Sequence, residues 1–240
     1  MGIPLFSLVR DCIQNGNWNL RAARSDRQLQ LLSFITSLQP SPVSDSTMWL
    51  RQETNSKNFS SKEVWNAIRS KNPTVSWYSL VWHKVAIPKH AAATWLFMLN
   101  RNPTFDRMVA WGLDVETICL LCGSSSESQN HLFFDCPFSN RVWSALLLKL
   151  DILNAPTSWA QIISWLPAAL PQRDAQLSLL LLWQASIYEL WKERNRRLHQ
   201  GLTLPHYKIF KRIVYLIKNK AMALKNVGSK HGEALTLLWF

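Results

Sequence analysis

The chain has 240 residues, of which 48% are hydrophobic and 18% charged, which excludes wholesale disorder and allows a sizeable core. Glycine occurs only seven times, which favours helices over a turn-rich β fold. The net charge of +12 is concentrated at one end, since residues 190–240 hold 11 Lys and Arg against two Glu. This basic excess predicts a polyanionic partner, such as RNA, DNA or an anionic membrane surface, although a merely solvated basic surface is the alternative.

The first half of the chain reads as short helices separated by irregular connections. In chain order we expect an irregular segment at 1–26, a helix at 27–38, a Pro/Ser linker at 39–46, a short extended piece at 48–52 and a helix at 58–70. Ser60 and Glu63 have the spacing of a capping box at the start of the last of these helices.

The second half is more strongly helical. We expect a helical or extended stretch at 77–85, helices at 91–101, 104–111 and 137–150, a Trp- and Pro-rich connection at 154–171, and long helices at 174–199 and 205–226. Trp95, Leu96 and Leu99 should form the apolar side of the 91–101 helix. Four tryptophans could stack on nucleobases, but core packing is the favoured role for Trp77, Trp82, Trp95 and Trp111.

These elements predict a mostly α fold, in which a helical domain carries one zinc-knuckle segment and is followed by a basic helical region. The expected division is an N-terminal segment with its linker at 1–46, a zinc-binding domain at 47–150 and a basic C-terminal region at 151–240. The most apolar run is far shorter than the roughly 20 residues of a membrane span. Since no signal peptide is visible either, we expect an intracellular protein of the nucleus or cytoplasm, not secreted and not in a membrane.

Three of the four cysteines lie close together, in the segment C-L-L-C-G-S-S-S-E-S-Q-N-H-L-F-F-D-C. Cys119, Cys122, His131 and Cys136 have the spacing of four zinc ligands, and thiolate and imidazole are donors that zinc favours. A complete set of four protein donors predicts a closed, structural Zn²⁺ site. The alternatives are thiols packed separately in a core and a Cys-x2-Cys redox pair, while Cys12 reads as an ordinary thiol.

Basic side chains gather on the last two long helices. If the partner is a nucleic acid, the candidate phosphate contacts are Lys192, Arg194, Arg196, Arg197, Lys208, Lys211 and Arg212. For the four at 192–197, favourable placement of cations at a helix C-terminus is an equally good explanation.

Several stretches together resemble the plant reverse-transcriptase zinc-binding domain, which follows the polymerase in LINE-type (non-LTR) retrotransposons. The resemblance rests on V-W-H-K-V-A-I-P-K-H at 81–90, on W-L-F-M-L-N-R-N-P-T-F-D-R-M-V-A-W-G-L at 95–113, on the cysteine–histidine segment, and on W-K-E-R-N-R-R at 191–197. It implies that the three cysteines and the histidine bind zinc, and that the domain associates with nucleic acid, RNA more than DNA. His83 and Ala92 depart from the family, which often has aromatic residues there.

The chain shows no polymerase, endonuclease or ribonuclease H motif, and no acidic set for a two-metal mechanism. We therefore expect a non-catalytic zinc-containing nucleic-acid-binding module, in the form of a C-terminal fragment or a domesticated derivative of such an element. One alternative is a protein–protein interaction or scaffold module. Another is an accessory fragment of a reverse transcriptase that works only with a polymerase domain supplied in trans.

Overall fold

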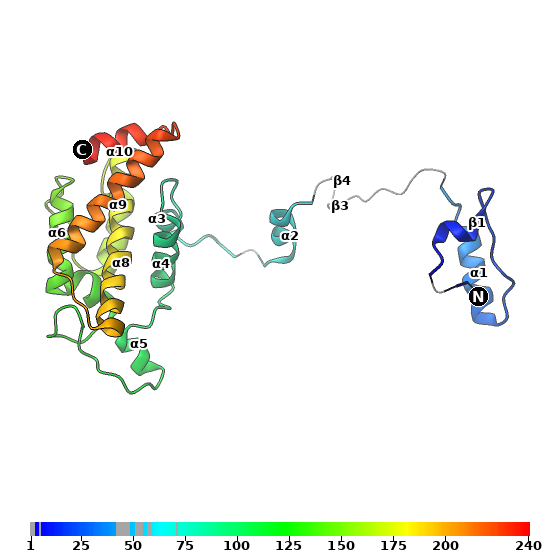
Figure 1. Ribbon diagram of the computed structural model, residues 1–240, viewed down its shortest axis with the longest axis horizontal. Coiled ribbons are helices and arrows are strands. Elements are labelled where there is room, and N and C mark those ends of the chain that lie inside the picture. Colours follow the sequence, from blue (N-terminus) through cyan, green and yellow to red (C-terminus); the bar gives the residue numbers. More distant parts are fainter. Residues whose placement is uncertain (1–2, 5, 42–48, 51–54, 57–58, 71) are drawn as a thin grey trace. The chain divides into compact units, whose positions relative to one another are not determined.

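The computed structural model describes residues 3–4, 6–41, 49–50, 55–56, 59–70 and 72–240. The chain divides into two compact units, Met1–Asn72 and Pro73–Phe240 (Figure 1). The prediction of a mostly α fold is confirmed, because the described strands are four two-residue segments in two hairpins. Among the described residues, no helix is both long enough and apolar enough to span a bilayer.

The first unit consists of small elements. They are the 3-10 helix η1 (Val9–Cys12), the antiparallel strands β1 (Ile13–Gln14) and β2 (Asn17–Trp18), the helix α1 (Asp26–Ser37), the antiparallel strands β3 (Trp49–Leu50) and β4 (Asn55–Ser56), and the helix α2 (Ser61–Ile68). Ser25 caps α1 by accepting from the Gln28 amide. None of the described side chains of this unit is buried, and Leu29 and Phe34 of α1 are each more than 60% exposed.

The predicted elements of this unit are present in part. The helix expected at 27–38 is α1, and the helix expected at 58–70 is α2 with Ser60 as its N-cap residue, although the Ser60 side chain makes no capping hydrogen bond. The extended piece expected at 48–52 includes β3, while positions 48, 51 and 52 lie outside the described residues, as does most of the predicted linker.

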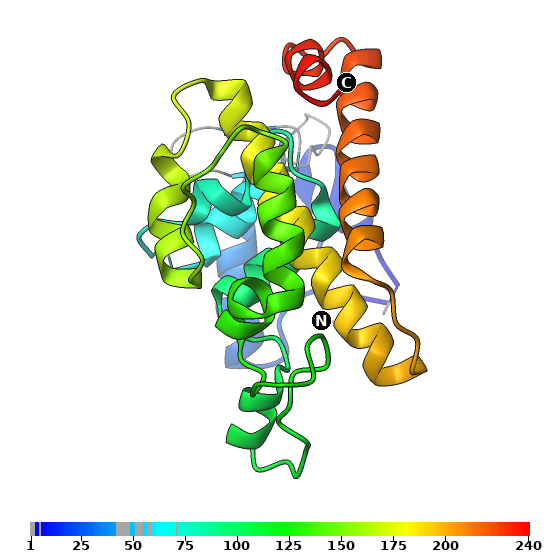
Figure 2. The ribbon, with the colours of Figure 1, turned by 90° about the vertical axis from the view of Figure 1, so that its left-hand side faces the viewer.

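The second unit is a helical bundle. Its elements are α3 (Tyr78–Val81), α4 (Pro88–Met98), α5 (Phe105–Ala110), the π-helix η2 (His131–Asp135), α6 (Pro137–Leu148), α7 (Trp159–Trp165), the 3-10 helix η3 (Leu166–Ala168), α8 (Arg173–Gln200), α9 (His206–Asn226) and α10 (Gly232–Trp239). Helix α8 lies at the centre and packs against α3, α4, α6, α9 and α10. Figures 1 and 2 both show α9 running beside α8, with α10 beside the C-terminal end of α9.

The sequence of α8 explains its central position. Its residues from Leu177 to Ile187 are all buried, and a helix that is apolar on every side must be surrounded by other elements. The helix ends at Gly201, whose φ of 66° is the left-handed conformation that glycine adopts without steric cost. The long helix predicted at 174–199 is thus confirmed, as are the helices expected at 137–150 and 205–226.

Two α-helices of the second unit were not predicted. The segment 154–171, expected to be a connection, contains α7, which Ser158 caps and which buries Ile162. The C-terminal helix α10 packs on α9 and buries Leu235 and Trp239. Both are short helices of seven and eight residues, for which helical periodicity is a weak signal.

The predicted domain boundary after residue 150 falls inside one hydrophobic core. Leu146 and Trp143 of α6 belong to the same cluster of buried side chains as Trp183 of α8 and Ile213 of α9. A boundary should lie where few contacts cross, and here the two sides share their core. In the structure, the division into compact units lies after Asn72 instead.

The expected core role of four tryptophans is wrong for three of them. Trp82, Trp95 and Trp111 are 42%, 37% and 52% exposed, and only Trp77 packs against the core. The buried face of α4 consists of His90, Ala91, Thr94 and Phe97, which are spaced as on one side of a helix. Trp95 lies outside this face. Among the tryptophans whose burial the structure describes, Trp143, Trp183 and Trp239 are the buried ones.

Candidate metal centre

A short hairpin positions the first two cysteines. Ile118 and Ser126 form an antiparallel bridge, and the Cys119 amide donates to the Ser125 carbonyl at 2.8 Å. Within the turn, the Gly123 amide donates to the Cys119 carbonyl at 2.8 Å. Gly123 has a φ of +70°, a conformation that side chains disfavour, so a glycine at this position lets the chain turn with both thiols on its inner side.

The other two donors lie at the two ends of the π-helix η2, His131 as its first residue and Cys136 directly after its last. The Cys136 amide donates to the His131 carbonyl at 2.7 Å, and the His131 amide donates to Ser128 Oγ at 3.2 Å. Between the two donors, Leu132, Phe133 and Phe134 are buried in the core. Because these three buried side chains anchor the segment in the core, they fix the positions of the histidine and the cysteine at its two ends.

All four predicted ligands meet at one point. Their donor atoms lie within 4.8 Å of one another, with Cys122 Sγ 3.3 Å from His131 Nε2 and Cys119 Sγ 4.0 Å from Cys136 Sγ. A tetrahedral zinc with Zn–S bonds of about 2.3 Å places its sulfurs about 3.8 Å apart, so the donor set fits this ion. Cys119 and Cys136 are fully buried, and Cys122 and His131 are half-buried.

The surroundings of the thiols favour metal binding at two of the three sulfurs. The hydrogen bond from Cys119 lowers the pKa of Cys136 to about 6. Burial raises the pKa of Cys122, but hydrogen bonds with Ser124 and His131 outweigh this effect and lower the pKa overall. The same contact with Cys136, together with burial, raises the pKa of Cys119. Since zinc binds thiolates, metal binding must remove the proton that this environment favours on Cys119.

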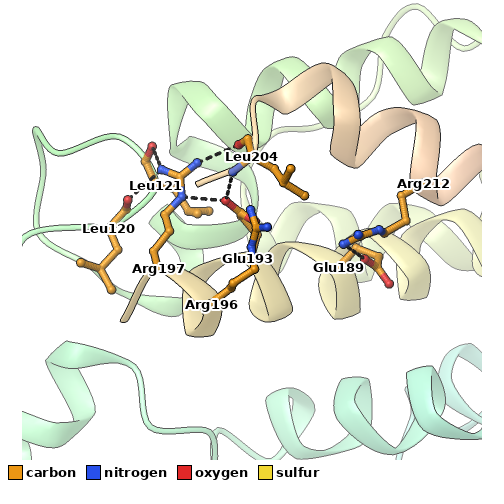
Figure 3. A network of polar contacts seen from close by, with 8 residues as sticks. All are labelled: Leu120, Leu121, Glu189, Glu193, Arg196, Arg197, Leu204 and Arg212. Atoms are coloured by element: carbon orange, nitrogen blue, oxygen red, sulfur yellow. Dashed lines mark hydrogen bonds and ion pairs between the residues drawn. The ribbon is translucent and has the colours of Figure 1, made fainter. Parts of the chain in front are cut away.

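Arg197 of α8 holds the turn between the first two cysteines. Its Nη1 donates to the carbonyls of Leu120 and Leu121, both at 2.9 Å, and these are the two residues between Cys119 and Cys122 (Figure 3). Its Nη2 donates to the carbonyl of Leu204, just before α9, at 3.1 Å. One guanidinium therefore connects the cysteine turn, the end of α8 and the start of α9.

Buried Glu193 completes this network, which we call the α8 clamp and define by Glu193, Arg196, Arg197 and Leu204. Glu193 Oε1 accepts from Arg197 Nε at 2.9 Å and from the Leu204 amide at 2.7 Å, and Oε2 lies 2.7 Å from Arg196 Nη2 (Figure 3). A carboxylate that is 2% exposed is costly to bury unless it is paired. Here two arginines and one amide pair it.

A second buried ion pair joins α8 to the residue after the hairpin. Arg194 Nη2 lies 2.8 Å from Glu127 Oε1, and both side chains are at most 2% exposed. The same carboxylate accepts from the Phe105 amide at 3.1 Å, and the Arg194 guanidinium lies over the Phe105 ring at 4.4 Å. The pair therefore fixes α5, the hairpin and α8 relative to one another.

These contacts correct part of the predicted phosphate-binding set. Arg194 is inaccessible, and the Arg196 and Arg197 side chains are only 22% and 13% exposed, because Glu127, Glu193 and backbone carbonyls occupy their donors. Lys192, Lys208 and Lys211 are exposed, and Arg212 is 41% exposed with Glu189 at 3.5 Å. The arginines of segment 191–197 thus serve the fold, and the exposed candidates lie mainly on α9.

Sequence reasoning missed the acidic partners. Glu193 stands three and four residues before Arg196 and Arg197, a spacing that favours ion pairs on a helix and could have revealed the clamp. Glu127 is 67 positions from Arg194, and no local pattern connects them.

Fold and donor set together define a helical domain with a Cys3His cluster positioned for zinc binding. Residues 59–143 match the model of a family described as zinc-binding in reverse transcriptase, and this segment contains all four donors. The resemblance to a reverse-transcriptase zinc-binding domain is thereby confirmed for that segment, which ends before α7. No curated protein and no solved structure matches the chain.

Proposed function

We propose that the chain is a non-catalytic, zinc-containing nucleic-acid-binding module, derived from the C-terminal part of a plant LINE-type reverse transcriptase and binding RNA in preference to DNA. The observation that carries this proposal is the coincidence of the family match over residues 59–143 with the four-donor cluster inside it. Zinc bound there would be structural, since it would cross-link the hairpin to the η2 segment and contribute folding energy.

The outer face of α9 supports the nucleic-acid part of the proposal. We define the α9 basic face as the exposed cations Lys208, Lys211, Arg212 and Lys225. They lie opposite the buried Ile209, Ile213 and Ile217. The sequence contains no Asp or Glu between Glu193 and Glu233, so no acidic side chain of α9 weakens the positive potential.

Aromatic side chains accompany these cations. Tyr207 and Tyr215 are 48% and 65% exposed, and the Nζ atoms of Lys208 and Lys211 lie 5.8 and 6.0 Å from the centre of the Tyr207 ring. A surface that combines cations with exposed aromatic rings suits a nucleic acid with accessible bases, which favours RNA loops over regular duplex DNA.

The α8 clamp gives the metal site an indirect part in this function. Arg197 holds the cysteine turn, and Arg197 and Glu193 both hold Leu204, two residues before the start of α9. In this proposal the metal site stabilises the region that sets where α9 begins, and α9 contacts the phosphates.

The test is binding of the full chain to a fluorescently labelled RNA stem-loop and to its DNA counterpart at about 50 mM salt, where phosphate contacts are strong. The triple variant Lys208→Gln/Lys211→Gln/Arg212→Gln should weaken RNA binding at least tenfold. The control Arg101→Gln/Arg141→Gln/Lys149→Gln removes the same charge from exposed positions elsewhere and should change it less than threefold. If neither nucleic acid binds the unmodified chain, the proposal fails.

A protein–protein interaction module is the second candidate, and exposed apolar side chains favour it. Trp111, Leu237 and Phe240 are 52%, 84% and 70% exposed. Light scattering after nuclease treatment distinguishes the two, because a nuclease-resistant dimer that binds no RNA would support this candidate instead.

A further inference from the structure

A hollow of about 350 Å³ lies between α3 and the first half of α8, and its lining includes no residue of the metal site or of the α9 basic face. Its lining includes Tyr78, Trp82, His83, Lys84, Arg173 and Gln176. This volume lies at the lower end of the range for small-ligand pockets.

Two glutamines of α8 fix the walls of this pocket. Gln184 is fully buried, and its Nε2 donates to the carbonyls of Leu80 and Val81, at 3.0 and 2.8 Å, which holds α3 against α8. In the first turn of α8, Gln176 donates to the Leu166 carbonyl and accepts from the Leu170 amide, and these two bonds hold η3 in place. Both walls are therefore set before any ligand arrives, and a preformed site loses less entropy on binding.

The pocket leaves two large aromatic rings in contact with solvent. Tyr78 is 51% and Trp82 42% exposed, and both line the same hollow. Exposed aromatic faces beside a cavity are typical of sites that stack planar ligands, and stacking works with every nucleobase.

Every charged side chain that lines the pocket is a cation. Lys84 and Arg173 are exposed, and neither forms an ion pair with any residue that the structure describes. Two free cations beside two aromatic rings suit a ligand that is both planar and anionic.

His83 also lines the pocket. Burial lowers its pKa to about 4, with a smaller opposing effect of Gln184, so the imidazole is neutral near pH 7. Within the described part of the chain, neither ring nitrogen has a hydrogen-bond partner of normal geometry, although both are shielded from solvent. His83 therefore belongs to the buried wall of the pocket and adds no charge to it.

We infer that this pocket binds one unpaired nucleotide of a single-stranded RNA segment, an inference that rests on the proposed function. The base stacks on Trp82 or Tyr78, and the phosphates on either side contact Lys84 and Arg173. The pocket adds a site for one unpaired base to the α9 surface, whose cations bind the backbone of any RNA.

The experiment compares two probes that differ only in an unpaired segment, a blunt RNA duplex and the same duplex with a ten-nucleotide 3′ overhang. The full chain should bind the overhang probe more tightly. Trp82→Ala and Lys84→Gln/Arg173→Gln should each remove most of this preference, by about tenfold, and leave binding of the blunt duplex unchanged. Trp82→Phe keeps an aromatic face and should retain the preference.

Photo-crosslinking gives an independent readout, because it identifies the peptide that contacts the RNA in the folded chain. An overhang with 4-thiouridine should crosslink to the peptide that contains Tyr78 and Trp82, and circular dichroism checks that each variant is folded. If the chain binds both probes equally, or if Trp82→Ala keeps the preference, the pocket is not a nucleotide site and the proposed function stands. If the chain binds neither probe, both proposals fail.

Discussion

At the residue scale, Arg197 makes more hydrogen bonds within the fold than its place in a basic sequence segment suggests. It donates to three backbone carbonyls and to Glu193, and two of those carbonyls belong to the cysteine turn. Partners that orient the residues around a metal contribute to its affinity even without touching the ion. We therefore regard Arg197 as a positioning residue for the metal site.

Replacing Arg197 by Gln should weaken zinc binding by about tenfold or more, because the Leu120 and Leu121 carbonyls lose their charged donor. Competition with a zinc-chelating dye measures the affinity. Arg196→Gln is the matched control, since Arg196 contacts Glu193 but neither carbonyl of the turn, and it should stay within about threefold of the unmodified chain. Equal affinities for the two variants would exclude the positioning role.

The four metal ligands could be predicted because their spacing alone restricts them to one turn and one short segment. The role of the arginines could not, because it depends on burial and on partners distant in sequence. Arg194 appears in the sequence beside other cations, yet its guanidinium is enclosed by Glu127 and the Phe105 ring. Only the packing of α5 and the hairpin on α8 decides between a phosphate contact and a buried ion pair.

At the element scale, α4 packs on α8 through a buried histidine. His90 stacks on Tyr188 with ring centres 4.5 Å apart, and neither of its nitrogens has a partner among the described residues. Burial lowers the pKa of His90 to about 4, and the charges of Lys89 and Lys192 add to this effect. The unfolded chain, with an ordinary pKa near 6.5, therefore binds a proton that the folded chain excludes between about pH 6.5 and pH 4.

It follows that His90 reduces stability as the pH falls through this range, by at most about 3 kcal/mol. His90→Phe keeps the stacked ring and removes the titration, so its unfolding free energy should decrease less between pH 7 and pH 4.5. Urea unfolding at several pH values measures the difference. Both proteins retain the metal ligands, so loss of zinc in acid affects them equally, and parallel pH curves would contradict this account.

The elements themselves could be predicted where their pattern was long. Helix α8 could be predicted from its run of leucines, and α9 from isoleucines and lysines that recur at helical spacing on opposite faces. Short helices such as α7 and α10 depend on contacts with α8 and α9 that no local window contains. The exposed tryptophans of α3 and α4 were misjudged for the same reason, since periodicity shows which residues share a face but not which face is covered.

At the scale of the whole molecule, the core, the metal donors and the clamp all belong to the unit Pro73–Phe240. The described residues before it contribute no buried side chain. A fragment of residues 73–240 should therefore bind one zinc and unfold in a single cooperative transition, within a few degrees of the full chain. Calorimetry with added zinc tests this, and an unfolded fragment would show that residues 59–72, part of the family match, complete the domain.

The most direct test of the account is the zinc content of the purified full chain, measured by mass spectrometry of the metal. Four donors within 4.8 Å predict one zinc per chain, lost on Cys136→Ser together with several kcal/mol of stability, while Cys12→Ser keeps both. A chain that binds no zinc, or that keeps it after Cys136→Ser, would contradict the assignment of this cluster as the metal centre.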